Sequence, residues 1–421
     1  MDKIVITGGR KLKGDIEISG AKNAALPIMA AALLTDEESV IENVPDLRDI
    51  QTMIRLLRSL GVKALYDHGR VLVRPGKSLK PIASYKLVST MRASVCVLGP
   101  LLARMGEAQV SLPGGCVIGP RPIDLHLKGL EALGAQIEVQ HGYVNARAIK
   151  KLKGNDIYLG GAFGSSVLAT ANVMMAAVLA RGVTTIENAA CEPEIVDLAR
   201  FLKKMGAKIA GEGSPSIEIE GVKKLKGVRY GIIPDRIEAG TYMVASAMAG
   251  GDVNIRQVEP SHQNALIDKF REAGIRVDKM KTSIRIRRSG RLKPVDVATL
   301  SYPGFPTDLQ AQMMALMTVT PGISVITEKI YPDRFMHVSE LNRMGARIFL
   351  EGPSAIVHGV KRLSGAPVMA SDLRASAALV IAGLVAEGTT EVQRVYHLDR
   401  GYEKLEIKLS SLGASVHREK E

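Results

Sequence analysis

Hydrophobic positions along the chain form two kinds of helical pattern, separated by short alternating segments. Stretches of the first kind are almost wholly apolar and rich in alanine, and a helix that is apolar on every side is typical of a domain interior. We expect them at residues 22–34, 92–105, 166–181, 237–249, 309–319 and 374–387. The pattern predicts a layer of buried helices, which small alanine side chains allow to approach one another closely.

Stretches of the second kind are amphipathic, as in residues 50–57, where apolar side chains recur at helical spacing. Each ends at a glycine between apolar residues, and glycine accepts the left-handed conformation that ends many helices. These glycines recur at intervals of roughly 70 residues, and they are Gly61, Gly134, Gly206, Gly274, Gly345 and Gly413. Alternating segments such as residues 283–287 predict strands.

The interval predicts six copies of one βαβαββ-type repeat. Buried helices with sheets outside them make an inverted α/β arrangement. A chain of 421 residues exceeds what one core usually serves. Six repeats divide most simply into two α/β domains of three repeats each.

Composition narrows the class of protein. A hydrophobic content of 46% with 24% charged residues is typical of a globular protein. No run of about 18 apolar residues occurs, and residues 1–6 predict a strand rather than a signal peptide. We therefore expect a cytoplasmic protein without membrane insertion. Cys96, Cys116 and Cys191 form no short-spaced pair, so neither a disulfide framework nor a metal site is indicated.

The net charge of +13 has three interpretations. It can reflect nucleic-acid binding, a cleft for a small polyanion, or surface charge without function. An aromatic content of 4% and the lack of a dense basic run count against nucleic acid. Arginine and lysine lining a cleft attract a small anion by electrostatic focusing, and we favour this interpretation.

Charged residues stand at the starts of the predicted inner helices, where neutral caps are usual. A helix N-terminus already attracts anions through its free N–H groups, so a cation there is favourable when both hold the same anion. These cations are Lys22, Arg92, Arg236 and Arg374, and basic residues recur near the amphipathic helices at Arg48, Arg121, Arg334 and Arg400. A single one of them would extend to solvent; their recurrence predicts a ligand with more than one anionic group.

Two residues depart from this pattern. Cys116 lies in a segment rich in glycine and proline, residues 111–122, next to basic neighbours, where exposure and nearby charge control thiol reactivity. It is a candidate acid, base or nucleophile. Asp308 occupies a place where other copies have cations, and Thr307 is positioned to cap that helix. A carboxylate in a cationic cleft is suited to accept a proton from a hydroxyl.

Eight motifs along the whole chain resemble one family, the UDP-N-acetylglucosamine 1-carboxyvinyltransferases, also known as UDP-GlcNAc enolpyruvyl transferases, of the EPSP synthase-like superfamily. They are SGAKNAALP at 19–27, TMRAS at 90–94, LPGGC at 112–116, RPIDLH at 121–126, FPTD at 305–308, RFMH at 334–337, DLRAS at 372–376 and DRGYE at 399–403. The cysteine motif separates this family from the shikimate-pathway enolpyruvyl transferases.

The resemblance implies an inside-out α/β barrel of two domains, residues 1–21 with 233–421 and residues 22–232, that close over the substrates. It implies transfer of the enolpyruvyl group of phosphoenolpyruvate to the 3′-hydroxyl of UDP-N-acetylglucosamine, with release of phosphate, through a tetrahedral ketal. That reaction is the first committed step of peptidoglycan synthesis, and the family is the target of fosfomycin. No cofactor or metal is implied, and we expect a monomer that binds no nucleic acid.

The resemblance also implies roles for single residues. Cys116 would be the general acid at the methylene carbon of phosphoenolpyruvate, and Asp308 would deprotonate the sugar hydroxyl. Lys22, Arg121 and Arg400 would hold phosphoenolpyruvate, and Lys22 and Arg400 count among the catalytic residues. The remaining substrate-binding residues would be Asn23, Arg92, Pro122, Ile123, Asp124, Leu125, Ser166, Val167, Ile330, Arg334 and Arg374.

One segment departs from the family. Leu168 stands where the family has glycine, and Gly164 stands where it often has a basic residue. The segment borders the nucleotide phosphates in the family, so a related enzyme with another nucleotide or sugar acceptor is an alternative. A silent nucleotide-sugar-binding protein and an RNA-end-processing protein are further alternatives; the retained Cys116 and Asp308 count against the first, and the absence of a marked histidine environment counts against the second.

Overall fold

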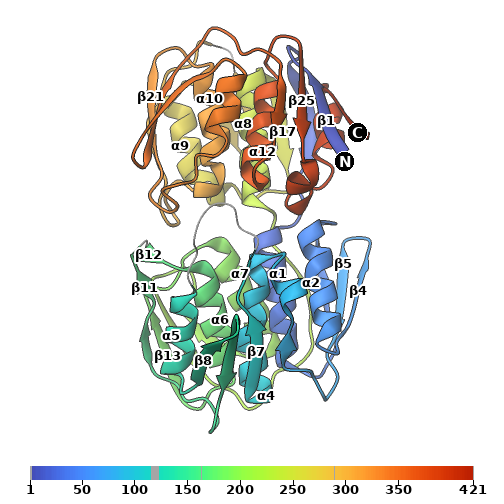
Figure 1. The fold of residues 1–421 in the computed structure, drawn as a ribbon, viewed down its shortest axis with the longest axis vertical. Coiled ribbons are helices and arrows are strands. Elements are labelled where there is room, and N and C mark those ends of the chain that lie inside the picture. The colour runs from blue at the N-terminus through green and yellow to red at the C-terminus, as the bar shows by residue number, and fades with distance from the viewer. Residues whose placement is uncertain (1, 115–122, 163, 289, 421) are drawn as a thin grey trace. The chain divides into compact units, whose positions relative to one another are not determined.

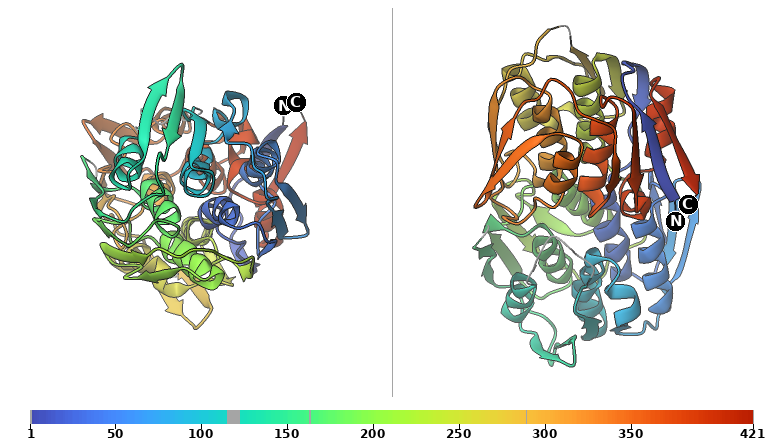
Figure 2. Two further views of the ribbon diagram at one scale, coloured as in Figure 1. Left: turned by 90° about the horizontal axis from the view of Figure 1, so that it is seen from below. Right: turned by 45° about the horizontal axis from the view of Figure 1, so that its top comes forward.

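The computed structural model describes residues 2–114, 123–162, 164–288 and 290–420. The chain divides into two compact units (Figure 1). Unit 1 contains Met1–Ser19 and Pro234–Glu421, and unit 2 contains the described residues from Gly20 to Ile233. From the N-terminal residues the chain thus passes from unit 1 to unit 2 and then returns to unit 1, as the colours of Figure 2 also show.

Unit 2 has three inner helical segments, α1 with η1, η2 with α4, and α6. Their bounds are α1 Lys22–Ala31, η1 Ala32–Leu34, η2 Arg92–Val97, α4 Leu98–Met105 and α6 Val167–Ala177. The other helices are α2 Arg48–Ser59, α3 Tyr85–Val88, α5 Asp124–Ala132 and α7 Pro193–Met205. Its strands are β3 Ser39–Glu42, β4 Lys63–Asp67, β5 Arg70–Arg74, β6 Ile82–Ala83, β7 Glu107–Ser111, β8 Gln136–Gln140, β9 Tyr143–Arg147, β10 Asp156–Tyr158, β11 Gly160–Gly161, β12 Gly164–Ser165, β13 Val183–Glu187, β14 Lys208–Ala210, β15 Ser216–Glu220 and β16 Arg229–Gly231.

Unit 1 repeats the same plan with inner helices α8, α10 after η4, and α12. Its helices are α8 Arg236–Ala249, η3 Pro260–Gln263, α9 Asn264–Glu272, η4 Thr307–Leu309, α10 Gln310–Thr318, α11 Val338–Arg343, α12 Leu373–Gly383, η5 Val395–Arg400 and α13 Leu405–Ser411. Its strands are β1 Asp2–Thr7, β2 Leu12–Glu17, β17 Gly251–Arg256, β18 Arg276–Lys279, β19 Ser283–Arg288, β20 Val297–Ala298, β21 Ile323–Thr327, β22 Arg347–Glu351, β23 Ser354–His358, β24 Pro367–Met369, β25 Thr389–Gln393 and β26 Ser415–Lys420.

Six four-stranded sheets occur among the described residues, and all share one topology. A parallel pair is extended by two antiparallel strands, as in the order β20-β21-β23-β22. The parallel neighbour comes from elsewhere in the chain: β16 pairs with β3 in unit 2, and β2 pairs with β17 in unit 1. The fold is therefore mixed α/β, with helices and small sheets in each unit.

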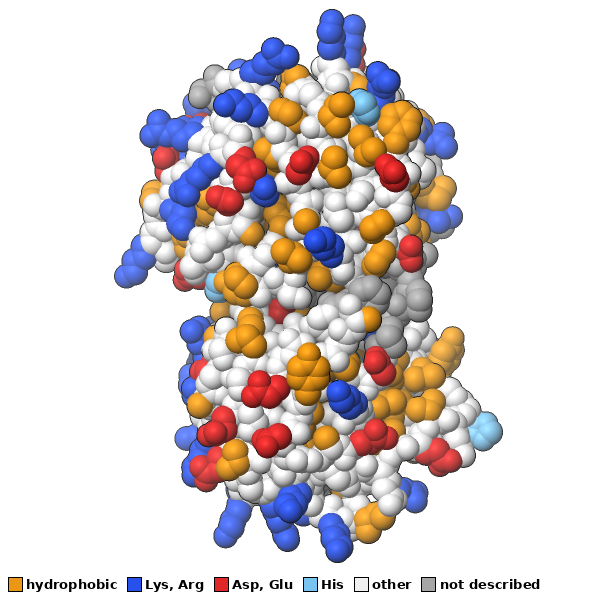
Figure 3. All heavy atoms as spheres, turned by 90° about the vertical axis from the view of Figure 1, so that its left-hand side faces the viewer, with side chains coloured by type: hydrophobic (Ala, Val, Ile, Leu, Met, Phe, Trp, Pro, Cys, Tyr) orange, Lys and Arg blue, Asp and Glu red, His pale blue; other side chains and the backbone are white. Residues whose placement is uncertain are grey.

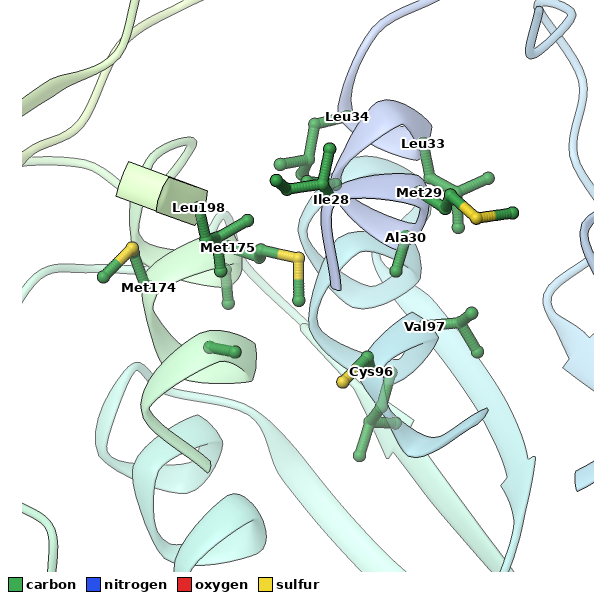
Figure 4. Packing of buried hydrophobic residues seen from close by; sticks show 14 of the residues in the cluster. Ile28, Met29, Ala30, Leu33, Leu34, Cys96, Val97, Met174, Met175 and Leu198 are labelled. Atoms are coloured by element: carbon green, nitrogen blue, oxygen red, sulfur yellow. The ribbon is translucent and has the colours of Figure 1, made fainter. Parts of the chain in front are cut away.

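The prediction of buried, alanine-rich inner helices is confirmed. Every residue of α10 is buried, and so is every residue of α1 except Asn23. Figure 4 shows side chains of α1, including Ile28 and Met29, among those of Cys96, Met174 and Met175 in the core of unit 2. Helices α4 and α6 approach each other closely at Gly99. A Cβ on this glycine would lie 2.3 Å from the carbonyl oxygen of Asn172.

The ends of the predicted helices were partly wrong. The helix expected at 92–105 begins as the 3-10 segment η2, and α6 and α12 end at Ala177 and Gly383, short of the predicted 181 and 387. Each of these two helices gives way to a turn that leads into the next strand. The prediction for the six repeat glycines is confirmed, because all six have positive φ, between 80° and 109°.

Charged side chains of both signs lie on the surface of each unit (Figure 3). On the face drawn in Figure 3, lysine and arginine side chains lie among acidic and hydrophobic ones on each unit. Among the described helices, none is long and apolar enough to cross a membrane.

Candidate functional site

Asp308 in unit 1 lies between two buried arginines. Its Oδ1 accepts a hydrogen bond from Nη1 of Arg334 at 2.8 Å, and its Oδ2 accepts one from Nη2 of Arg374 at 2.9 Å. The side chains of Arg334 and Arg374 are only 7% and 3% exposed, whereas that of Asp308 is 27% exposed. Two buried arginines therefore hold the carboxylate in place, while part of it remains exposed and accessible to a ligand.

Three different elements bring these groups together. Asp308 lies in η4, at the entrance to α10. Arg374 lies in the first turn of α12, where the Asp372 carboxylate caps the helix by accepting from the backbone N–H of Arg374 and of Ala375. Arg334 precedes α11, in a turn in which its backbone N–H donates to the carbonyl of Tyr331. Three residues that were each predicted for the site therefore lie together within unit 1.

The electrostatics of Asp308 follow from this geometry. Burial alone would raise the pKa of the carboxyl, but Arg374 and Arg334 outweigh it and hold the pKa well below its ordinary value. For Arg374, burial lowers the pKa, but Asp308 together with Tyr402 and Asp235 raises it by more, so the net pKa is raised. All three groups are charged at neutral pH.

Arg374 has further donors to offer. Its Nε and Nη1 are buried and have no hydrogen-bond partner among the described residues. Since buried polar groups are nearly always paired, these donors point to an anion that belongs beside them. The guanidinium carbon lies 5.4 Å from the centre of the Tyr402 ring, and the Tyr402 hydroxyl is 2.8 Å from that of Thr241. This support fixes the arginine before any ligand binds.

The prediction that Thr307 caps its helix was wrong. No side chain caps η4, whose first flanking residue is Pro306. The Thr307 hydroxyl instead donates to Oε2 of Glu328 at 2.8 Å and accepts from Nη1 of Arg334 at 2.9 Å. The carboxylate of a buried glutamate therefore replaces the helix end as the partner of this hydroxyl.

Arg400 and Ile330, also predicted for the site, lie in unit 1 on separate segments. Arg400 is the last residue of η5 and is half-buried. The backbone N–H of Ile330 donates to Oε1 of Glu328 at 2.9 Å. Glu328 itself was missed by sequence reasoning, because a glutamate beside a strand gives no sign of its burial.

Unit 2 presents its own cations at the starts of inner helices. Lys22 is the first residue of α1 and is 8% exposed. Its Nζ lies 3.4 Å from Oδ2 of Asp49, which is 4% exposed. Asn23 follows on the same turn and is half-buried. A buried lysine fixed at a helix N-terminus fits the predicted anion site, and Asp49 is a partner that the sequence analysis did not identify.

Arg92 begins η2 and is half-buried. Behind it lies a buried polar pair, in which Nδ1 of His126 is 2.8 Å from the amide nitrogen of Asn172. Burial, with a smaller contribution from Arg92, lowers the pKa of His126 to about 3. The imidazole is therefore neutral at physiological pH and acts as a hydrogen-bond partner inside unit 2.

Five of the predicted nucleotide-sugar residues, Ile123, Asp124, Leu125, Ser166 and Val167, lie at the starts of α5 and α6, which pack against each other. Ile123 flanks α5 and is buried, and Asp124 begins the helix and is exposed, whereas Leu125 is half-buried. The helices approach closely at Gly129, where a Cβ would lie 2.3 Å from Cγ2 of Val173.

Ser166 caps α6 by accepting from the backbone N–H of Ala169 at 3.4 Å, and Val167 is the first helical residue. Leu168 follows and is half-buried against the core of unit 2. Gly164, in the short pair of strands before α6, has φ of 88°. Glycine adopts that conformation more readily than a residue with a side chain.

Cys116, Arg121 and Pro122 lie outside the described residues. The other two cysteines are described. Burial raises the pKa of Cys96 to about 12, and burial together with Glu192 raises that of Cys191. Both thiols are protonated at neutral pH.

The chain is similar to proteins of known family. A family model described as EPSP synthase (3-phosphoshikimate 1-carboxyvinyltransferase) matches residues 6–409. A UDP-N-acetylglucosamine 1-carboxyvinyltransferase of Myxococcus xanthus is 57% identical over 423 residues, covering 100% of both chains. The protein of the same name from Desulfosudis oleivorans is 57% identical over 418 residues, covering 99% of each.

Solved structures agree in fold. The enolpyruvyl transferase NikO from Streptomyces tendae superposes with a TM-score of 0.88 at 24% identity, over 99% of this chain and 98% of its own. An EPSP synthase from Acinetobacter baumannii superposes with a TM-score of 0.75 at 19% identity, over 100% of both chains. At these identities the likeness concerns the fold alone.

Proposed function

The chain belongs to the EPSP synthase family and, within it, to the UDP-N-acetylglucosamine 1-carboxyvinyltransferases, and we infer that it transfers the enolpyruvyl group of phosphoenolpyruvate to the 3′-hydroxyl of UDP-N-acetylglucosamine, releasing phosphate. The observation that carries this inference is the 57% identity with a relative of that name over the full length of both chains. The product would enter peptidoglycan synthesis.

We propose that Asp308 takes the proton of the attacking sugar hydroxyl. Part of its carboxylate is exposed, and it is ionised at neutral pH because Arg374 and Arg334 lower its pKa, against the opposing effect of burial. A carboxylate with a lowered pKa is a weak base, so proton transfer must accompany formation of the bond between the sugar oxygen and C2 of phosphoenolpyruvate. Asp308 therefore orients the hydroxyl first and accepts its proton as that bond forms.

The acid that balances this step must protonate C3 of phosphoenolpyruvate. We assign that part to Cys116 from the sequence motif alone. Addition of the sugar oxygen at C2 and of a proton at C3 gives a tetrahedral ketal. The thiolate left by the first step then takes a proton from C3, and phosphate departs from C2, which restores the carbon–carbon double bond. The proton held by Asp308 leaves with the phosphate, so both residues return to their starting state.

The cations hold the negative charge of substrate and intermediate. We propose that Lys22, Arg121 and Arg400 bind phosphoenolpyruvate, whose phosphate and carboxylate match forked donors. Support comes from the burial of Lys22 at the start of α1 and from the unpartnered Nε and Nη1 of Arg374, which would complete the charge stabilisation together with Arg92 and Arg334. Donors fixed in advance lower the barrier most.

For the nucleotide sugar we propose Asn23, the segment from Arg121 to Leu125, and Ser166 with Val167. The packing of α5 on α6 supports this set, since Asp124 and Leu125 begin one helix of the pair and Ser166 and Val167 lie at the start of the other. Ile330 is proposed as a further contact to this substrate.

Finer aspects of the architecture belong to the same proposal. We propose that the six sheets with one topology are six βαβαββ-type repeats, arranged as an inside-out α/β barrel in two domains. The domains would be residues 1–21 with 233–421, and residues 22–232. A cytoplasmic, monomeric enzyme without a cofactor remains our prediction.

The experiment that tests the function measures phosphate release from phosphoenolpyruvate by the purified protein, with and without UDP-N-acetylglucosamine. We expect release only with the nucleotide sugar, and a product heavier by one enolpyruvyl unit in mass spectrometry. Release with another nucleotide sugar but not with this one would assign a different acceptor and direct attention to Leu168. Absence of release from a folded protein with every acceptor would overturn the proposal.

A further inference from the structure

Glu328 follows strand β21, is fully buried and has no part in the chemistry proposed so far. Its carboxylate accepts four hydrogen bonds. Oε1 accepts from the Thr299 hydroxyl at 2.5 Å and from the backbone N–H of Ile330 and Tyr331 at 2.9 and 3.0 Å, and Oε2 accepts from the Thr307 hydroxyl at 2.8 Å. So many donors around one buried carboxylate fix its position closely.

The N–H groups that donate to Thr299 and Thr307 determine which way the two threonine hydroxyls point. The backbone N–H of Lys329 donates to the Thr299 oxygen at 2.9 Å, and Nη1 of Arg334 donates to the Thr307 oxygen at 2.9 Å. Neither N–H group is able to accept. Each threonine hydroxyl must therefore turn its own hydrogen toward Glu328, which acts as the common acceptor.

The same atoms lead directly to Asp308. Nη1 of Arg334 has two hydrogens, and it donates to Thr307 at 2.9 Å and to Oδ1 of Asp308 at 2.8 Å. Its position beside the carboxylate therefore depends on the Thr307 oxygen, and the Thr307 oxygen is turned toward Nη1 because its hydrogen points at Glu328. A continuous chain of hydrogen bonds thus runs from Glu328 to Asp308.

We propose that Glu328 is a positioning residue for Asp308. It acts through Thr307 to fix Arg334 against the carboxylate, and through the backbone of Ile330 and Tyr331 to shape the segment beside it. This inference rests on the proposed function, in which Asp308 receives the proton of the sugar hydroxyl. Glu328 itself does not touch the substrate.

The proposal has a clear physical consequence. A displacement of a reacting group by about 1 Å is enough to lower a rate by about a hundredfold. Without an acceptor at Glu328, the direction of the Thr307 O–H bond is no longer fixed, and its hydrogen can turn toward Nη1 of Arg334. Nη1 then loses its fixed place between Thr307 and Asp308. We therefore expect loss of this acceptor to lower kcat strongly while the melting temperature changes little.

Thr307→Val tests the relay with little change of shape. Calorimetry with UDP-N-acetylglucosamine gives the number of binding sites, and kcat is expressed per such site. We expect this kcat to fall about tenfold or more. kcat/KM should fall in parallel, because that is the result of losing an interaction made in the transition state. Thr307→Ser keeps the hydroxyl and should restore most of the activity.

Thr327→Val is the matched control. Thr327 lies one position before Glu328 and is half-buried, and its hydroxyl pairs with that of Ser354 at 2.9 Å, not with the chain to Asp308. We expect a similar change of melting temperature in Thr327→Val and Thr307→Val, but near-parent kcat only in the control. Equal kcat losses in the two valine variants would make the hydroxyl merely structural and overturn the proposal.

Glu328→Gln tests the carboxylate itself. A glutamine amide presents two donors where the native side chain meets donors on both oxygens, so one of the four hydrogen bonds at least must break. In the double variant with Thr307→Val, the loss should be smaller than the product of the two single losses, because both residues act on the same arginine. Multiplicative losses would show independent roles and contradict the relay.

The parent protein separates this inference from the function on which it rests. If the parent releases no phosphate with UDP-N-acetylglucosamine, the proposed function fails. If the parent is active and Thr307→Val, with normal melting temperature and substrate binding, is equally active, the positioning role fails while the function stands.

Discussion

Asp308 and Arg374 are 66 positions apart in the chain, yet Oδ2 of the aspartate lies 2.9 Å from Nη2 of the arginine. Both lie at the entrances of inner helices, one before α10 and one in the first turn of α12. The pair joins two adjacent inner helices of unit 1 at their N-terminal ends.

Arg374→Lys should strongly reduce activity although it preserves the charge. A lysine has one nitrogen where the guanidinium has three, so it is unable to hold Asp308 and also offer the unpartnered Nε and Nη1 to an anion. We expect kcat/KM for phosphoenolpyruvate to fall by about a hundredfold or more, as for removal of one preorganised donor. Steady-state kinetics measure it; a loss below about threefold would contradict the assignment.

Asp308→Asn should remove most turnover and also change how stability depends on pH. The folded-state pKa of Asp308 is depressed, because Arg374 and Arg334 outweigh burial. Its contribution to stability is therefore present above the ordinary pKa of about 4 and is lost as the pH falls through the lower folded value. Urea unfolding between pH 5 and the lowest pH at which the protein stays soluble should show a weaker acid destabilisation in the variant.

His126 should make the protein less stable at mildly acidic pH. Burial and Arg92 lower its folded-state pKa to about 3 from the ordinary 6.5, so the unfolded chain binds a proton that the folded chain excludes. Stability from this group is complete above pH 6.5 and declines as the pH falls toward about 3. Unfolding free energies of the parent and of His126→Gln should differ in slope over this range. Identical slopes would show that the imidazole titrates normally.

Gly129→Ala should weaken nucleotide-sugar binding. A Cβ at this position would lie 2.3 Å from Cγ2 of Val173, so either the Val173 side chain or α5 must shift. Because Val173 is fully buried, we expect α5 to move and to carry Asp124 and Leu125 with it. We expect a several-fold rise in the KM for UDP-N-acetylglucosamine and a smaller change for phosphoenolpyruvate. The added substitution Val173→Ala makes room and should reverse the effect. Glu131→Ala, on the same helix, serves as control.

Cys116→Asp should keep part of the activity, because a carboxyl group is also able to donate a proton. It should resist epoxide inhibitors, which alkylate a thiol. Turnover after incubation with fosfomycin measures both properties. A variant as sensitive as the parent would remove Cys116 from its assigned role.

The sequence predicted those features that a single residue type controls locally. The six repeat glycines have positive φ because only glycine adopts that conformation readily. The charges of Asp308 and Arg374 were recognised because they break the usual pattern at a helix start. Glu328 and Asp49 were missed, since their importance comes from burial and from partners distant in sequence, such as Thr307 and Lys22. A glutamate or aspartate in a polar segment gives no local signal of either.

The course of the chain through the two units has a consequence for biosynthesis. The described residues of unit 2 lie between Gly20 and Ile233, so a growing chain already contains all of them before half of unit 1 has been made. Strand β1, in contrast, pairs on one side with β25 and on the other with β26. Strand β1 must therefore wait until β25 and β26 have been made, and a variant without residues 415–420 would leave one edge of β1 unpaired.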